Sequence, residues 1–146
     1  MKRHPILIPI SREHHQVLLL AQLLKKDAPL YRGLPDTLDG KLEYARTKYQ
    51  ELLLLHLKRD QESLYPYLRQ WPELSDLLEE LMAQSHWMTR TFEMLDKSAT
   101  AEKLDQIGHS LEQYVRTKER KLFQTAQELL DETEMLTLGK EISRHS

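Results

Sequence analysis

Apolar residues recur every three or four positions along most of the 146-residue chain, a spacing that predicts amphipathic α-helices. The pattern is interrupted at 27–36, which hold two prolines and one glycine, at Trp71-Pro72, and in the run that begins at Asp96. We therefore expect helices over about 11–26, 37–68, 72–95 and 101–134, with Ser11 as the first N-cap. Residues 1–10 contain two prolines and are expected to be extended, and the tail after 134 has room for one short helix.

Four amphipathic helices joined by short links predict an all-α fold, an up-down-up-down four-helix bundle. A coiled coil is the alternative, but no strict heptad repeat persists along the chain. Four glycines and six prolines leave little material for the turns of a protein made of many short strands. The length suits one domain that spans residues 1–146, with its core over about 10–134.

Two polar residues, His56 and Asp60, interrupt the inward stripe of the second predicted helix. The full stripe reads Ala45, Tyr49, Leu52, His56, Asp60, Leu64 and Tyr67. Residues four apart lie one above the other on a helix, so the imidazole and the carboxylate share one face. A carboxylate buried in a bundle needs a metal, a hydrogen-bond donor or a cation as its partner. The pair therefore marks a candidate site inside the bundle.

The fourth predicted helix repeats the outline of the second at an offset of 58 positions (56 to 114 and 60 to 118). Tyr114 stands where His56 stands in the second helix, and Lys118 stands where Asp60 stands. The apolar pair that follows is repeated as well, with Leu122-Phe123 matching Leu64-Tyr65. The second and fourth helices therefore resemble one element that is used twice.

The first and third predicted helices each supply one histidine to this site, His15 and His86. A bundle with a two-fold repeat places all four helices around one central point, where these side chains can meet. We expect His14 at the surface, because it points about 100° away from His15 around the helix. His86 lies at the edge of the inward stripe of its helix, which reads Leu74, Leu78, Leu81, Ser85, Met88 and Phe92.

Charge and composition narrow the possible partners. The formal net charge is −2, which argues against nucleic acid and against a polybasic membrane-binding surface. No apolar run approaches the roughly 18 residues that a membrane-spanning helix needs, so we expect no membrane partner. The chain has no cysteine and therefore no disulfide framework or thiolate chemistry. A cytoplasmic location fits these features.

Four segments together carry a resemblance to the hemerythrin-like (HHE cation-binding) domain family. They are SREHHQVLLL, HLKRDQESLYPYL, QSHWMTRTF and YVRTKERKLFQTAQ, and the similarity covers roughly residues 6–130. The resemblance implies a non-haem di-iron site held by one His from each helix and by bridging carboxylates from the second and fourth helices. Members of the family bind or sense oxygen, nitric oxide or redox state, or store and deliver iron. The positions that match the ligands of the family are His15, His56, Asp60 and His86.

This chain departs from the family at the two fourth-helix positions. Tyr114 replaces a ligand histidine, and Lys118 replaces a bridging carboxylate. A charged Lys has no lone pair and cannot be a metal ligand. Its charge also repels a metal cation, by roughly 4 kcal/mol for unit charges at about 4 Å and an effective dielectric of 20. We therefore expect no intact di-iron centre.

Two interpretations of the site remain. In the first, Lys118 replaces the metal and pairs with Asp60, while Tyr114 hydrogen-bonds a neighbouring His. In the second, one non-haem iron is held by His56, Asp60 and His86, the residue types of a two-His-one-carboxylate site, and Lys118 moves away or loses its proton. The cofactor is thus either none or one non-haem iron.

The function expected from these residues is that of a hemerythrin-like binding, sensing or interaction module that has lost its di-iron centre. Its partner would be a small molecule or another protein. The alternative is a mononuclear iron protein that binds or senses oxygen or nitric oxide, or an iron-dependent enzyme of unknown substrate. We assign no catalytic residue.

Overall fold

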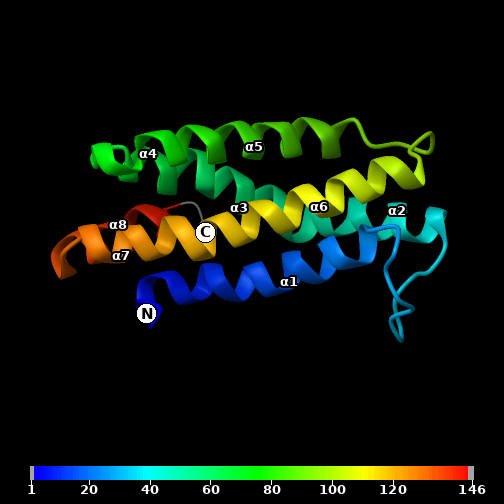
Figure 1. The fold of residues 1–146 in the computed structure, drawn as a ribbon, viewed down its shortest axis with the longest axis horizontal. Coiled ribbons are helices and arrows are strands. Elements are labelled where there is room, and N and C mark those ends of the chain that lie inside the picture. Colours follow the sequence, from blue (N-terminus) through cyan, green and yellow to red (C-terminus); the bar gives the residue numbers. More distant parts are fainter. Residues whose placement is uncertain (1, 145–146) are drawn as a thin grey trace.

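The structure, a computed structural model, describes residues 2–144, and residue 1 and residues 145–146 of the expected domain lie outside this range. Helices account for nearly all of the regular structure, and residues 2–144 contain no strand. The helices pack side by side into an elongated bundle (Figure 1). The prediction of an all-α, bundle-like fold is therefore confirmed.

The α-helices are α1 (Ile8–Leu24), α2 (Leu38–Lys48), α3 (Leu54–Arg59), α4 (Tyr65–Leu68), α5 (Ser75–Glu93), α6 (Ala101–Thr117), α7 (Phe123–Leu129) and α8 (Glu132–Ser143). Two 3₁₀ turns, η1 (Pro5–Leu7) and η4 (Pro72–Leu74), lead into α1 and α5. Three π-helical turns, η2 (Tyr49–Leu53), η3 (Asp60–Leu64) and η5 (Lys118–Leu122), lie between consecutive α-helices. The second and fourth predicted helices are thus continuous rods, α2 to α4 and α6 to α7, that contain π turns.

The first helix begins earlier than the sequence predicted. Residues 5–7 already form a 3₁₀ turn, and α1 starts at Ile8 instead of near Ser11. Pro9 is tolerated because it lies in the first turn, where its missing N–H would have no partner inside the helix. The side chain of His4 caps the 3₁₀ turn η1 by accepting a hydrogen bond from the amide of Ile6. The expectation of an extended segment over 1–10 is therefore wrong for residues 5–10, whereas His4 has the extended backbone that was expected.

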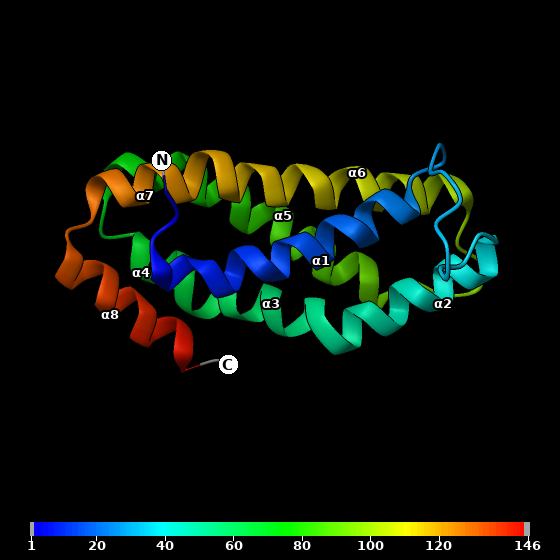
Figure 2. The same cartoon turned by 90° about the horizontal axis from the view of Figure 1, so that it is seen from below.

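The buried face of this longer helix follows a regular spacing of three and four. Its buried residues include Leu7, Ile10, His14, Val17, Ala21 and Leu24. This face packs along α6 (Figure 2), and the backbone of Gly108 in α6 lies close to that of α1. A Cβ atom at Gly108 would lie 2.6 Å from the carbonyl oxygen of Ala21, so only glycine permits this approach without a shift of the backbone.

The fourth rod ends earlier than expected, at Leu129 instead of near residue 134. Asp131 then starts α8 with a capping box, in which its side chain accepts from the amide of Glu134 and the Glu134 side chain accepts from the amide of Asp131. Helix α8 packs against η1 and η3 near one end of the bundle (Figure 2). No helix of the described residues is long and apolar enough to cross a membrane.

The repeat between the second and fourth rods is present in the backbone. The π turns η3 and η5 begin at Asp60 and Lys118 and end at Leu64 and Leu122, so both are displaced by the same 58 positions (118 − 60 and 122 − 64). π turns inside α-helices are often found at functional sites. Here the two equivalent turns begin at Asp60 and Lys118, the polar residues that interrupt the inward stripes of the two rods.

Candidate functional site

Five buried polar side chains meet inside the bundle, and we call them the core cluster. They are His14 of α1, His56 of α3, Asp60 at the start of η3, Tyr114 of α6 and Lys118 at the start of η5. None of them is more than 2% exposed. Because α1 and both rods contribute, the cluster is assembled only when the bundle is packed.

The ammonium group of Lys118 is the centre of the cluster. Its Nζ donates to Asp60 Oδ2 at 2.6 Å and to His56 Nε2 at 3.0 Å. It also lies 5.3 Å and 6.0 Å from the ring centres of Tyr114 and Phe123, on whose faces a cation is favoured. The Lys118–Asp60 pair that the first interpretation predicted is therefore present.

Burial and this pairing act against each other on the two charged groups. Burial lowers the pKa of Lys118, and Asp60 opposes that shift. Burial would raise the pKa of Asp60, but the adjacent Lys118 charge and its hydrogen bond outweigh it, so the pKa of Asp60 is lowered. A charge-assisted hydrogen bond of this length is among the stronger polar contacts in proteins. We therefore treat the pair as an ammonium and a carboxylate at neutral pH.

Tyr114 does not bond a histidine as expected, because its hydroxyl instead donates to Asp60 Oδ2 at 2.7 Å. Tyr65 forms a short hydrogen bond with the Tyr114 hydroxyl. Since Tyr114 gives its only proton to Asp60, Tyr65 must be the donor to Tyr114. Burial, followed by the Asp60 charge, raises the pKa of both phenols well above the usual value, so both keep their protons.

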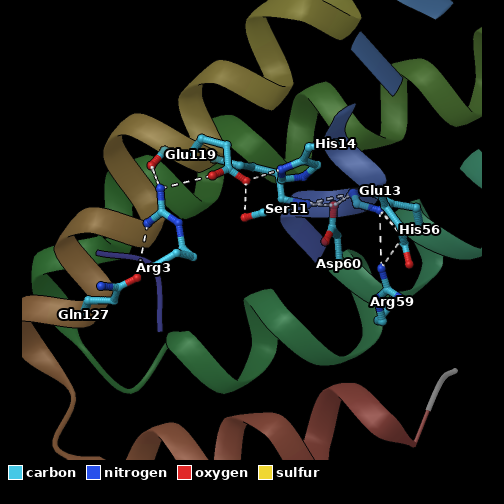
Figure 3. Close-up of polar contacts among 10 residues, drawn as sticks. Arg3, Ser11, Glu13, His14, His56, Arg59, Asp60, Glu119 and Gln127 are labelled. Atoms are coloured by element: carbon cyan, nitrogen blue, oxygen red, sulfur yellow. Dashed lines mark hydrogen bonds and ion pairs between the residues drawn. The ribbon is translucent and has the colours of Figure 1, made fainter. Parts of the chain in front are cut away.

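The Nδ1 atom of each buried histidine is hydrogen-bonded to the carboxylate of a glutamate at the edge of the cluster (Figure 3). His56 Nδ1 lies 2.7 Å from Glu13 Oε1, and His14 Nδ1 lies 2.5 Å from Glu119 Oε2. A carboxylate accepts only, so the proton of each neutral ring is assigned to Nδ1. The Nε2 atom of each ring is then a lone-pair acceptor, which for His56 agrees with its bond from Lys118.

The outer carboxylates have partners of their own. Arg59 Nη2 donates to Glu13 Oε1 at 2.6 Å. Ser11 Oγ donates to Glu119 Oε2 at 2.7 Å, and Arg3 lies 3.1 Å from Glu119 Oε1 (Figure 3). Burial raises the pKa of both glutamates, but these hydrogen bonds and charges lower each to about 2. Glu13 and Glu119 were not predicted from the sequence, although Glu13 directly precedes His14 and Glu119 directly follows Lys118 in the chain.

The ring of His14 is neutral because of its burial and of the nearby Lys118 charge. Burial, followed by the Lys118 charge, lowers its pKa to about 3, although the bond to Glu119 opposes the shift. His14 Nε2 and Asp60 Oδ1 are buried and have no hydrogen-bond partner among the described residues. These two lone pairs are the atom types that a metal would take as ligands.

The arrangement as it stands does not fit a metal ion. Within residues 2–144, no group of three or more His, Cys, Asp or Glu side chains is placed to hold one. The Lys118 ammonium contacts both His56 Nε2 and Asp60 Oδ2, so it takes up the positions on these atoms that a metal would need. Instead, the cluster consists of two histidines, each hydrogen-bonded to a carboxylate, around the ammonium group of Lys118.

Two of the predicted site residues lie elsewhere. His15 is exposed on the outer face of α1, while its neighbour His14 is buried. The two were assigned the wrong way round, because helix α1 starts at Ile8 and its inward stripe, counted from Leu7 and Ile10, reaches His14. A search for that spacing upstream of Ser11 would have found it.

His86 is exposed on α5, and the buried residue at this level is its neighbour Ser85. The periodicity of the third helix already placed His86 at the edge of its stripe, and the structure agrees with the periodicity instead of the ligand assignment. Ser85 accepts a hydrogen bond from Gln61 Nε2 at 2.7 Å. Of the four predicted ligands, the structure therefore brings only His56 and Asp60 together.

The neutral, buried His14 predicts that the protein loses stability in acid. An unfolded His takes up a proton below pH 6.5, whereas folded His14 does so only near pH 3, so the unfolded state binds more protons between these values. We expect His14 to contribute a fall in unfolding free energy of up to about 1.4 kcal/mol per pH unit in this window. Glu13 and Glu119 add a further loss as the pH falls from 4.5 towards 2.

Urea titrations at pH 7.0, 6.0 and 5.0 test the predicted contribution of His14. These pH values lie above the range in which Glu13 and Glu119 take up protons. His14→Leu should reduce the dependence of unfolding free energy on pH without abolishing it, because the pKa of His56 is also lowered by burial and the Lys118 charge. His15→Leu, which changes an exposed neighbour, should leave the dependence as in the original protein. An unchanged pH dependence in His14→Leu would show that His14 titrates normally in the folded state.

Comparison of the chain with protein-family models, with curated proteins and with solved structures gave no match. The residues and their geometry therefore carry the functional argument on their own.

Proposed function

We propose that the chain is a hemerythrin-like up-down-up-down four-helix bundle in which the Lys118 ammonium replaces the metal centre. In this proposal it is a binding or sensing module for a small molecule, or an interaction module for a protein partner. One observation carries the proposal: Lys118 Nζ lies 2.6 Å from Asp60 Oδ2 and 3.0 Å from His56 Nε2. These are the two residues that match the ligand positions of the family in sequence and also meet in space.

The hydrogen bonds around the Lys118 ammonium agree with its proposed position in place of a metal centre. Metal-bound histidines usually give their second ring N–H to a carboxylate or carbonyl, which fixes the ring and its tautomer. His14 and His56 both have this arrangement, with Glu119 and Glu13 as the carboxylates. The proposal explains why such supports persist around a site whose central cation is an ammonium.

The alternative is a mononuclear iron protein that binds or senses oxygen or nitric oxide, or an iron-dependent enzyme. The donor set first considered for it included His86, which lies on the outside of α5. The observation that favours the alternative is the pair of unpartnered lone pairs on His14 Nε2 and Asp60 Oδ1. It requires Lys118 to leave the cluster or to lose its proton.

Metal content separates the two. The protein should be produced in iron-supplemented cells, purified without oxygen and without a His-tag column, and examined by elemental analysis and absorption spectroscopy. We expect far less than one iron per chain, no Fe(III) absorption band, and a melting temperature that a chelator does not change. About one iron per chain, lost in a His14→Leu variant, would overturn the proposal and establish the alternative.

A further inference from the structure

An open pocket of about 630 Å³ lies outside the core cluster, between α4 and the first part of α5. One wall is Tyr65, the first residue of α4, and Arg69, which directly follows α4 and bonds its amide to the Tyr65 carbonyl, so the two lie one helical turn apart. The other wall, on α5, is formed by Ser75, Leu78, Met82 and His86, spaced by three and four. The pocket is therefore an elongated groove, with Ser75 and His86 about 16 Å apart along the axis of α5.

The groove combines an apolar floor with two polar side chains, those of Arg69 and His86. Leu78 is 4% exposed and Met82 is half-buried, so both present apolar surface to the groove. Arg69 and His86 are exposed, and neither side chain has a hydrogen bond or an ion pair with any of the described residues 2–144. The guanidinium of Arg69 therefore has all of its donors available to a ligand.

We propose that this pocket binds a small organic carboxylate with an apolar body, such as an alkyl or aryl carboxylic acid. The Arg69 guanidinium receives the carboxylate through two parallel hydrogen bonds, the geometry that suits this group best. The apolar body lies on Leu78 and Met82. Glu79, which also lines the pocket, repels anions, so a singly charged carboxylate is preferred to a doubly charged phosphate.

The position of the pocket connects it with the core cluster. Tyr65 lines the groove, and its hydroxyl donates to Tyr114, which donates to Asp60. Tyr65 itself is 0% exposed, so a bound ligand lies over the buried residue that begins the hydrogen-bonded chain ending at Lys118. The role of the pocket in sensing rests on the proposed function, whereas binding of a carboxylate to Arg69 does not depend on whether the core holds a metal.

The probe is 3-phenylpropanoate, with the neutral 3-phenylpropanamide as its isostere, titrated into the ¹⁵N-labelled full chain. We expect saturable shifts in the amides of α4 and the first half of α5 with the carboxylate, and binding at least tenfold weaker with the amide. Arg69→Gln should weaken the carboxylate by about tenfold or more, the usual value of a hydrogen bond to a charged group. Glu79→Gln should strengthen it several-fold, and Arg90→Gln, an exposed change on α5 outside the pocket, should have no effect.

Equal binding of the carboxylate and the amide, or unchanged binding in Arg69→Gln, would overturn the proposal. So would an absence of saturable shifts, or shifts spread over the whole surface. Since residues 69, 79 and 90 are exposed, circular dichroism should show all three variants folded. A failure of carboxylate binding would not change the conclusion from the iron content of the core. Iron in the core would likewise not change the result for carboxylate binding at Arg69.

Discussion

Replacing Lys118 by methionine is expected to lower the free energy of unfolding by about 3–5 kcal/mol, the usual cost of removing one partner from a buried ion pair. The substitution keeps an unbranched side chain of similar length but removes the ammonium. Asp60, which is 0% exposed, would keep its bond from the Tyr114 hydroxyl but lose the only charge that is paired with it at hydrogen-bond distance among residues 2–144. His56 Nε2 would also lose its donor. Urea unfolding at pH 7 measures the loss.

Lys121→Met is the matched control, because Lys121 lies on the same π turn as Lys118 but is exposed. A surface change of this kind should alter the unfolding free energy by less than about 0.5 kcal/mol. The double variant Asp60→Asn with Lys118→Met strands no charge and should recover part of the loss. A loss of under about 0.5 kcal/mol in Lys118→Met would mean that the ammonium contributes nothing to the core.

The helical content and most of the core follow from the periodicity of the sequence. The inward stripe predicted for the third helix is buried at each of its six positions, from Leu74 to Phe92. Thr37, Pro72 and Thr100 mark the starts of helical segments where a cap or an N-terminal proline is expected. Local chemistry decides these features, so a single sequence is enough to predict them.

The stripe of the second rod was predicted less well because a π turn adds a residue to the helix. The regular 3.6-residue spacing selected Leu52 for the core, whereas the structure buries Leu53 and leaves Leu52 half-buried. Leu53 ends the π turn η2, which begins at Tyr49. After the turn, His56 and Asp60 are again inside. The position of such a turn depends on tertiary packing, so the pattern of apolar residues does not reveal it.

The outer half of the site could not be predicted for a similar reason. Glu13 lies 43 positions from His56, and Glu119 lies 105 positions from His14, so both bonds depend on how the helices are rotated against each other. That rotation also decides between His14 and His15. The family resemblance pointed to the neighbours His14 and His15 but selected His15, which is exposed, because similarity of a HH dipeptide does not specify which residue faces inward.

Changing Tyr114 and Lys118 to the residues of the hemerythrin-like pattern is expected to create a metal site. Tyr114→His with Lys118→Glu removes the central ammonium and supplies a nitrogen and a carboxylate on the fourth rod, opposite His56 and Asp60. The carboxylate supports of His14 and His56 are already in place. If the alignment with the family is right, elemental analysis after anaerobic reconstitution should rise from the level of the original protein towards two irons per chain.

Adding a further substitution to this double variant decides which histidine of α1 participates. His14→Leu should reduce the bound iron substantially, because the Nε2 atom of His14 is buried and unpartnered among the described residues. His15→Leu should leave iron binding unchanged, because His15 is exposed and points away from the core cluster. A folded double variant that takes up no iron would refute the alignment of the fourth rod with the family. Loss of iron in His15→Leu, but not in His14→Leu, would instead refute the rotation of α1 that buries His14.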